Sequence, residues 1–369
     1  MTAPGMVALI TRWLAAMALA GAAAFSAGQT PPASEDAVPP PAPPSQPSTD
    51  IALVLPLESP AYARAAEAVR AGVLAAAEAS GARIRVRVFG HGDDGVLPAF
   101  EAAQRAGARV IVGPLVRDDL KIVAAMAIDL PYTIALNQFD EAAGPPPTLY
   151  TFPLSIDSDA RLIARRIRDM PVATGTPSAI IVTSDTPLMR RFTAAFTQEW
   201  LAGGGTVPGV FRFDGTAEPM TSMRRELSRR RPSAALLAVD GPGAAQAKPY
   251  LQIIPAYASA LVFERETTST VRDLDGLIVT EIPWIVAPSA PQFAGLPRRD
   301  FPSAALTRLY ALGLDAFRVA QAFREGVPER FVLEGATGQV TLGEGRQFTR
   351  EGRFAVFRDG TLTPLDGPR

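Results

Sequence analysis

Short apolar segments alternate with helical segments along most of the chain, and this alternation restricts the fold more than any other feature. In the first part, strands are expected at residues 51–57 (IALVLPL), 83–90 (RIRVRVFG), 108–115 (ARVIVGPL) and 132–137 (YTIALN), and helices at 61–80, 97–106 and 118–129. Gly81 and Gly107 end the first two helices, and Leu130-Pro131 breaks the third. Repeated strand–helix units at this spacing predict an α/β domain with a parallel sheet.

A second series of the same kind follows after Phe152. Strands are expected at 178–184 (SAIIVTS), 206–213 (TVPGVFRF), 233–240 (SAALLAVD), 257–264 (YASALVFE) and 275–284 (DGLIVTEIPW), and helices at 156–170, 188–202, 220–231 and 303–323. Residues 331–369 change to short strands separated by glycine turns. Two successive series, each too short for a large domain, predict two similar lobes.

The first fifty residues differ from this pattern. Arg12 precedes an apolar run at 13–24, and small residues then allow cleavage after Ala24 or Ser26, so we expect a signal peptide over 1–26 and export of the protein. An uncleaved membrane anchor is the alternative, although about twelve uninterrupted apolar residues are few against the roughly 20 that span a bilayer. Residues 27–50 are rich in proline, alanine and serine, which predicts a disordered linker.

Composition excludes several kinds of chemistry. The chain has no cysteine, which removes thiolate metal sites, thiol catalysis and the lipid acceptor of a bacterial lipoprotein. It has one histidine, His91, which rules out a metal site made of several histidines. Its net charge of −1 argues against nucleic-acid binding. No nucleophile–base motif, phosphate-binding loop or dinucleotide-binding motif follows a strand. We therefore predict a non-enzyme without catalytic residues, cofactor or metal.

Ligands of open α/β sheets bind at the carboxyl ends of the strands, and these ends supply the candidate site residues. They are Glu58, Ser59, Tyr62, Arg117, Asn137, Ser184, Asp185, Asp240, Glu281 and Trp284. The turn after the third expected strand, at 113–118, contains a proline, which has no N–H, and no hydroxyl side chain, so we do not expect this turn to clamp a carboxylate.

Four of these ten candidates also have a structural interpretation. Arg117 can bind an anion, or it can pair with the neighbouring Asp118 or Asp119. Glu58 and Tyr62 can serve helix capping and packing instead of a ligand, and Trp284 can pack between lobes.

Two further patterns favour a solvated surface. His91 lies in FGHGDDG, where two glycines indicate a solvated turn more than a metal site. Arginines cluster at 165–168, 190–191, 224–225 and 229–231, either as a basic face toward an acidic partner or the cell wall, or as solvated helix faces.

Several motifs together resemble a known family. IALVLPLESP, GARVIVGPLVRDDL and YTIALNQ resemble the opening lobe of type I periplasmic binding proteins. TEIPWIVAP, RLYALGLDAFRVA, EGATGQVTL and GRFAVFRDGTLTPL, in this order, resemble the C-terminal domain of the penicillin-binding protein activator family of the LppC/LpoA type. The resemblance covers about residues 50–369.

The resemblance implies a Venus-flytrap fold, a bilobed α/β architecture with two parallel-sheet lobes joined by three crossings. Lobe one would comprise about 50–151 and 284–327, and lobe two about 152–283 and 328–369. It also implies a non-catalytic periplasmic regulator that binds and activates a bifunctional, class A penicillin-binding protein in peptidoglycan synthesis, with peptidoglycan as a further candidate partner.

Two departures from the family pattern stand out. The helical-repeat domain and the lipid-acceptor cysteine of longer relatives have no counterpart in this sequence. The alternative function is a periplasmic solute-binding protein for a small polar ligand, serving a transporter or a sensor. The sequence leaves open whether a small molecule binds at all.

Overall fold

The computed structural model describes residues 49–126, 130–140, 144–171, 175–251, 253–263 and 272–365. They belong to one compact unit, which spans 46–369. The expected signal peptide and nearly all of the expected linker lie outside the described residues.

A five-stranded parallel sheet forms the N-terminal part of the fold, with strand order β2-β1-β3-β4-β5. Its strands are β1 (Ile51–Leu55), β2 (Val86–Gly90), β3 (Val110–Val112), β4 (Tyr132–Ala135) and β5 (Leu149–Thr151), and its connecting helices are α1 (Ala63–Ala79), α2 (Leu97–Arg105) and α3 (Arg117–Ala124). Strand β1 is apolar throughout because it pairs on both sides, with β2 and β3, and is buried at every position. This is the parallel sheet that the strand–helix alternation predicts.

A seven-stranded sheet follows, in the order β15-β14-β10-β9-β8-β6-β7. Its strands are β6 (Ala179–Thr183), β7 (Val210–Arg212), β8 (Ala234–Ala238), β9 (Ala256–Ala258), β10 (Ile278–Glu281), β14 (Arg353–Arg358) and β15 (Thr361–Pro364), and its helices are α4 (Ile156–Arg168), α5 (Pro187–Ala202), α6 (Ala217–Arg230) and α7 (Gly241–Ala247). The strands from β6 to β10 are parallel, whereas β14 and β15 are antiparallel to their neighbours.

Two local expectations in this sheet were wrong. The strand expected over 257–264 ends at Ala258, because the Ser259 hydroxyl accepts a hydrogen bond from Leu261 N at 3.3 Å and begins a short 3-10 helix, Ala260–Val262. Helix α7 was not expected in its glycine- and proline-rich sequence. Asp240 begins it by accepting a hydrogen bond from Gly243 N at 2.8 Å.

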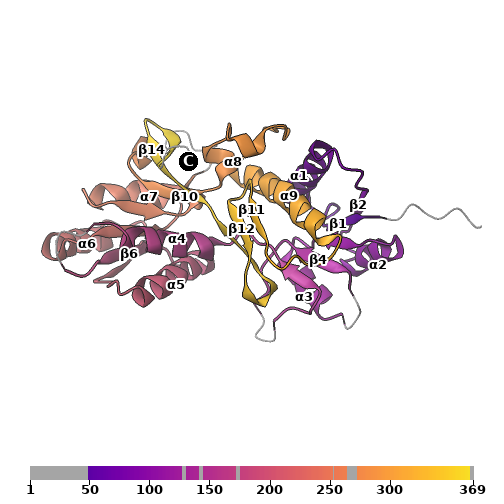
Figure 1. Cartoon of the computed structure of the whole chain (residues 1–369). Helices are drawn as coiled ribbons and strands as arrows, with labels where there is room; N and C mark the ends of the chain where they lie inside the picture. The colour runs from indigo at the N-terminus through magenta and orange to yellow at the C-terminus, as the bar shows by residue number, and fades with distance from the viewer. Residues whose placement is uncertain are drawn as a thin grey trace, which may run out of the picture. The chain divides into compact units, whose positions relative to one another are not determined.

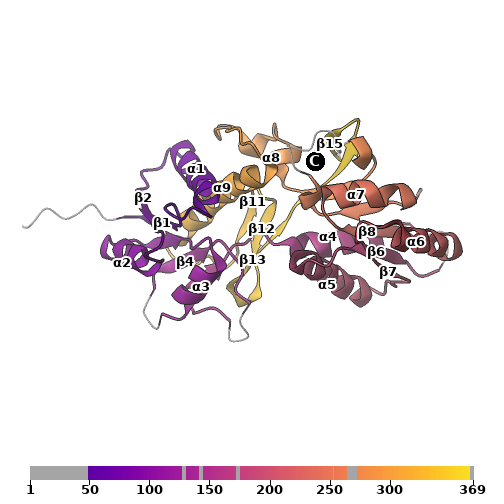
Figure 2. The ribbon, with the colours of Figure 1, turned by 180° about the vertical axis from the view of Figure 1, so that it is seen from behind.

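Helix α9 (Ala304–Phe323) returns the chain to the first sheet after a short helix α8 (Pro283–Val286). It lies beside α1 in both views of the ribbon (Figures 1 and 2), and it also contacts β3 and β4. The two helices approach closely at two glycines. An added Cβ on Gly72 would lie 2.1 Å from Tyr310 O, and one on Gly313 would lie 2.2 Å from Val69 O. The contact therefore depends on the absence of side chains at the crossing.

A small antiparallel sheet, β11 (Val332–Glu334), β12 (Gln339–Leu342) and β13 (Phe348–Glu351), precedes β14. Its Val340 and Phe348 are buried in the core of the first sheet, and β13 also contacts α4. The segment 328–369, expected in lobe two, therefore divides. Strands β14 and β15 join the second sheet, while the buried side chains of β11–β13 join the first core.

The chain passes between the two larger sheets three times, as the predicted fold class requires. It leaves the first sheet after β5 to enter α4, and it leaves the second after β10 to enter α8 and α9. It returns from β13 to β14, which pairs with β10. Elements of both sheets are thus brought together around the crossings.

Candidate functional site

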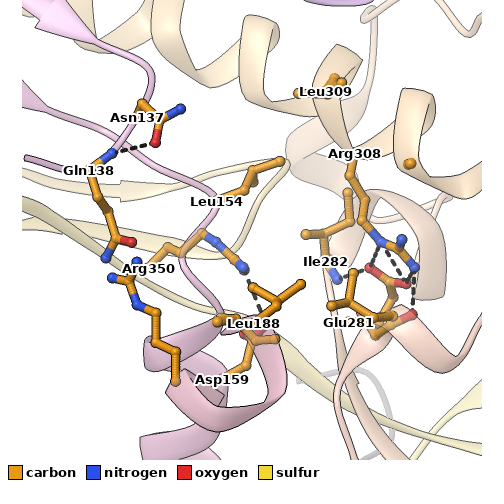
Figure 3. Close-up of a pocket in the computed structure, with 15 residues that line it drawn as sticks. Asn137, Gln138, Leu154, Asp159, Leu188, Glu281, Ile282, Arg308, Leu309 and Arg350 are labelled. Carbon is orange, nitrogen blue, oxygen red and sulfur yellow. Dashed lines mark hydrogen bonds and ion pairs between the residues drawn. The ribbon is translucent and has the colours of Figure 1, made fainter. Parts of the chain in front are cut away.

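A cavity of about 390 Å³ lies where α4, α5, β10, α9 and β13 meet (Figure 3). Its polar wall consists of Asn137, Gln138, Asp159, Arg191, Glu281, Arg308 and Arg350. Its larger apolar side chains are Leu154, Ile156, Leu188, Leu261, Ile282 and Leu309. The volume is within the range of small-molecule pockets, and the combination of aliphatic wall and few polar groups is typical of them.

One side of the cavity carries a buried ion pair between Glu281 and Arg308. Glu281 is the last residue of β10, and Arg308 lies in the second turn of α9. Arg308 Nη2 lies 2.7 Å from Glu281 Oε2, and Nε lies 3.1 and 3.2 Å from the two carboxylate oxygens. Nη2 also donates to the carbonyl of Ala260 at 2.8 Å. The pair therefore connects the second sheet to the helix that packs on the first.

A second ion pair, between Asp159 and Arg350, lies across the cavity. Asp159 is in the first turn of α4, and Arg350 is on β13. Their closest approach is longer than in the first pair, at 3.3 Å from Arg350 Nη2 to Asp159 Oδ2. Burial raises the pKa of Asp159 above its ordinary value, while the charge of Arg350 opposes that shift.

The rim of the cavity carries a partly exposed network. Arg191, on α5, holds the carboxylate of Asp157 at 2.7 to 3.0 Å, and its Nη1 lies 3.7 Å from Asp140. Arg117, at the start of α3, pairs with the same Asp140. Asp140 thus lies between arginines from helices of the two sheets. The expectation that Arg117 pairs with Asp118 or Asp119 was wrong, because Asp118 pairs with Lys121 at 3.1 Å and Asp119 faces His91.

The structure brings some of the predicted site residues together. Asn137 and Glu281 line the cavity, and the Asn137 amide donates to Leu115 O at 2.8 Å. Tyr62 and Arg117 line a shallower depression that shares Asn137 and Leu309 with the cavity.

Other predicted residues lie elsewhere. Ser184 and Asp240 line a separate depression at the second sheet, where Asp240 also caps α7. Asp185 is exposed and pairs with Arg190 at 2.6 Å and with Arg212 at 2.7 Å. These residues do not share a wall with Glu281.

Three predicted residues serve local structure outside the cavity. Glu58 is exposed, and its N–H donates to His91 O at 3.1 Å. The Ser59 carbonyl accepts from Ala63 N at 2.8 Å at the start of α1. Trp284 is 3% exposed, with the guanidinium of Arg298 3.6 Å above its ring.

His91 does not lie in a solvated turn, as the glycine-rich sequence around it suggested. Its N–H donates to Leu55 O at 3.1 Å, which extends the β1–β2 pairing, and its side chain is buried 3.7 Å from Asp119. Burial lowers the pKa of His91, and the neighbouring carboxylates oppose that shift.

Sequence reasoning missed four charged residues of the cavity. Arg308, Asp159 and Arg191 are in helices, and Arg350 is on a strand outside the two main parallel series, so none lies at a strand end. One signal was present for Arg308: it is a lone arginine in the apolar segment RLYALGLDAF, where a charge needs a partner.

Across the residues the structure describes, no group of three histidine, aspartate or glutamate side chains could hold a metal ion. Over the same residues, every helix is too short or too polar to cross a bilayer. The exposed arginines 224, 225, 229 and 230 lie on α6, where Arg230 pairs with Glu226.

The two larger sheets, their three connections and a cavity at the connections define the class of type I periplasmic-binding-protein-like folds. A structure from Chromobacterium violaceum, named as a "putative branched-chain amino acid ABC transporter", is 30% identical, with a TM-score of 0.73, over 84% of this chain and 100% of its own. The LpoA (YraM) C-domain from Haemophilus influenzae, named as a regulator of PBP1A, has the same fold at 23% identity and a TM-score of 0.71, over 86% of this chain and 100% of its own.

The family model described as "LppC putative lipoprotein" matches residues 42–218 and 217–360, so the chain belongs to this family. Among curated proteins, penicillin-binding protein activator LpoA from Haemophilus influenzae is 26% identical over 294 residues, and LpoA from Pantoea ananatis is 25% identical over 329 residues. Each alignment covers 76% of this chain but 50% and 47% of the respective relative. The chain thus spans about half the length of these relatives.

Proposed function

We propose that the protein is a non-catalytic periplasmic regulator that binds and activates a bifunctional, class A penicillin-binding protein. The observation that carries this proposal is the family match, which runs from residue 42 to 360 through both larger sheets. The names of the curated relatives support a penicillin-binding protein as the partner, and its bifunctional, class A type is part of the proposal. Localisation in the periplasm follows from the signal peptide expected over 1–26.

Activation by a non-enzyme requires a difference in affinity. The protein must bind the active conformation of the synthase more tightly than the inactive one, since equal affinity for both shifts no population. A tenfold preference corresponds to about 1.4 kcal/mol, which a modest interface can supply.

The test uses the purified protein and a class A penicillin-binding protein from the same cell. We expect co-purification and a saturable rise in the rate of peptide cross-linking in reconstituted peptidoglycan synthesis. A cross-linking assay without any synthase controls for activity of the regulator itself. No binding and no change in rate, with protein that is folded by circular dichroism, would contradict the proposal.

The second candidate function is solute binding for a transporter or sensor. The 30% identical Chromobacterium violaceum structure and the cavity favour it. The turn at 113–118, without a hydroxyl, is unlike the carboxylate clamp of amino-acid-binding proteins. A genetic test separates the two candidates: solute binding predicts a defect in uptake or sensing of one nutrient upon deletion, and regulation predicts a defect in cell-wall cross-linking.

A further inference from the structure

Arg308 and Arg350, two of the three arginines that line the cavity, differ in how well their hydrogen-bonding groups are satisfied. Arg308 makes short contacts with Glu281, at 2.7 to 3.2 Å, and with the carbonyl of Ala260. Arg350 makes only long ones, at 3.3 Å to Asp159, 3.3 Å to Ser155 O and 3.5 Å to Thr337 O. Its side chain is 7% exposed, and within the described part of the chain its buried Nε has no acceptor.

A buried guanidinium in this state has unused capacity for an anion. A buried N–H group without an acceptor is energetically unfavourable, so an anion beside this guanidinium would improve its hydrogen bonding and its charge balance. Burial raises the pKa of Asp159, the partner of Arg350. The Asp159 carboxylate lies 3.3 Å from Nη2 and leaves Nε without an acceptor, so part of the hydrogen-bonding capacity of the Arg350 guanidinium is unused.

The remaining charges of the wall are paired. The other acid that lines the cavity, Glu281, is neutralised by Arg308, and Arg191 at the rim is held by Asp157. The rest of the wall is mainly aliphatic, with Leu154 from the loop before α4, Leu188 from α5 and Leu309 from α9. A complementary molecule therefore has an aliphatic body and one acceptor group.

We propose that the cavity binds a small aliphatic carboxylate, which pairs with the guanidinium of Arg350. This site is formed by Arg350 on β13 and Asp159 on α4. It does not involve the turn at 113–118, which lacks a hydroxyl group. It goes beyond the proposed regulatory function and does not depend on it, because a ligand can bind here with or without the synthase.

The first experiment titrates the full chain with 4-methylpentanoate by isothermal titration calorimetry, with 4-methylpentanamide as the uncharged probe of the same body. We expect saturable binding of the acid and affinity for the amide at least about tenfold weaker, the usual effect of losing a charge-assisted hydrogen bond. Absence of saturable binding of the acid, or equal affinity for acid and amide, would overturn the proposal.

Two variants locate the site. Arg350→Gln removes the donor and should weaken binding of 4-methylpentanoate at least about tenfold, with the fold checked by circular dichroism. Leu188→Glu places a like charge in the wall at a side chain that is 46% exposed, so the fold should tolerate it; Leu188→Gln is the matched neutral control. The glutamate should weaken binding of the acid more than the glutamine does.

If Arg350→Gln does not fold, the comparison between the two Leu188 variants decides alone. Binding that is unchanged in Leu188→Glu places the carboxylate elsewhere and overturns the proposal. These measurements involve no penicillin-binding protein, so their outcome is independent of the test of the regulatory function.

Discussion

Arg308 on α9 forms an ion pair with Glu281 at the end of β10, with 2.7 Å between Arg308 Nη2 and Glu281 Oε2. Neither side chain is more than 9% exposed. The pair joins a helix of the first core to a strand of the second sheet at one of the three chain crossings. Removal of either partner leaves a buried, uncompensated charge.

Arg308→Met should therefore lower the free energy of unfolding by about 3–5 kcal/mol, measured by urea denaturation. The double variant Arg308→Met/Glu281→Leu should recover much of that loss, because no charge is then left unpaired. Arg230→Met breaks a largely exposed pair with Glu226 and serves as the control, with an expected change within about 1 kcal/mol. A decrease in the free energy of unfolding below about 1 kcal/mol in Arg308→Met would contradict the conclusion that Arg308 and Glu281 form a buried ion pair.

Gly72 and Gly313 allow α1 and α9 to touch, and alanine at either position should destabilise the fold. The new Cβ would meet backbone oxygen at 2.1 or 2.2 Å, so the helices must separate, at about 1–3 kcal/mol. The sign of the change in the free energy of unfolding is informative, because alanine stabilises an ordinary helix position by about 1 kcal/mol relative to glycine. Urea denaturation measures the change in the free energy of unfolding. A more stable Gly72→Ala variant would be incompatible with the close crossing.

Asp315 fixes the β11–β12 turn to α9. Its fully buried carboxylate accepts hydrogen bonds from Ala336 N, Thr337 N and Thr337 Oγ1 at 2.7 to 2.8 Å. Asp315→Ala should lower the free energy of unfolding by about 3 kcal/mol or more, because three buried donors lose their acceptor. Asp315→Asn retains an acceptor oxygen and should lose less. Hydrogen exchange at residues 336 and 337 should be faster in both, and unchanged exchange in Asp315→Ala would refute this role.

The pKa of His91 can be measured by NMR without ambiguity in assigning the imidazole signal, because His91 is the one histidine of the chain. Burial lowers its pKa in the folded protein, so between that value and 6.5 the unfolded chain binds more protons than the folded one. Stability relative to His91→Gln should therefore be constant above pH 6.5 and fall as the pH drops through the folded pKa. The proton NMR signal of the imidazole gives this pKa directly, and a value above 6.5 would contradict the burial argument.

The sequence predicts the main architecture because its signals are local. Apolar runs such as 51–57 mark the fully buried strands, and Gly81 and Gly107 mark the ends of α1 and α2. Helix α7 escaped prediction because two glycines in its first turn disfavour a helix, whereas the favourable signals are only the capping Asp240 and a proline that the first turn tolerates.

The cavity is harder to predict because its charged residues are brought together over long sequence separations. Arg308 and Glu281 are 27 residues apart, and Arg350 and Asp159 are 191 apart. No spacing in the sequence links such pairs, and the rule of strand ends found only Asn137 and Glu281 of the wall. An arginine inside an apolar helix indicates that a buried acidic partner exists, but the sequence does not identify that partner.

The packing of α9 on α1 also has a consequence for the time course of synthesis. More than 200 residues separate the two helices, and the whole second series of strands lies between them in the sequence. The first sheet leaves the ribosome with the face for α9 uncovered, and it stays so until residue 323 has been made. An early-synthesised sheet that must wait for a late helix exposes apolar surface meanwhile, and it is a natural substrate for a holding chaperone.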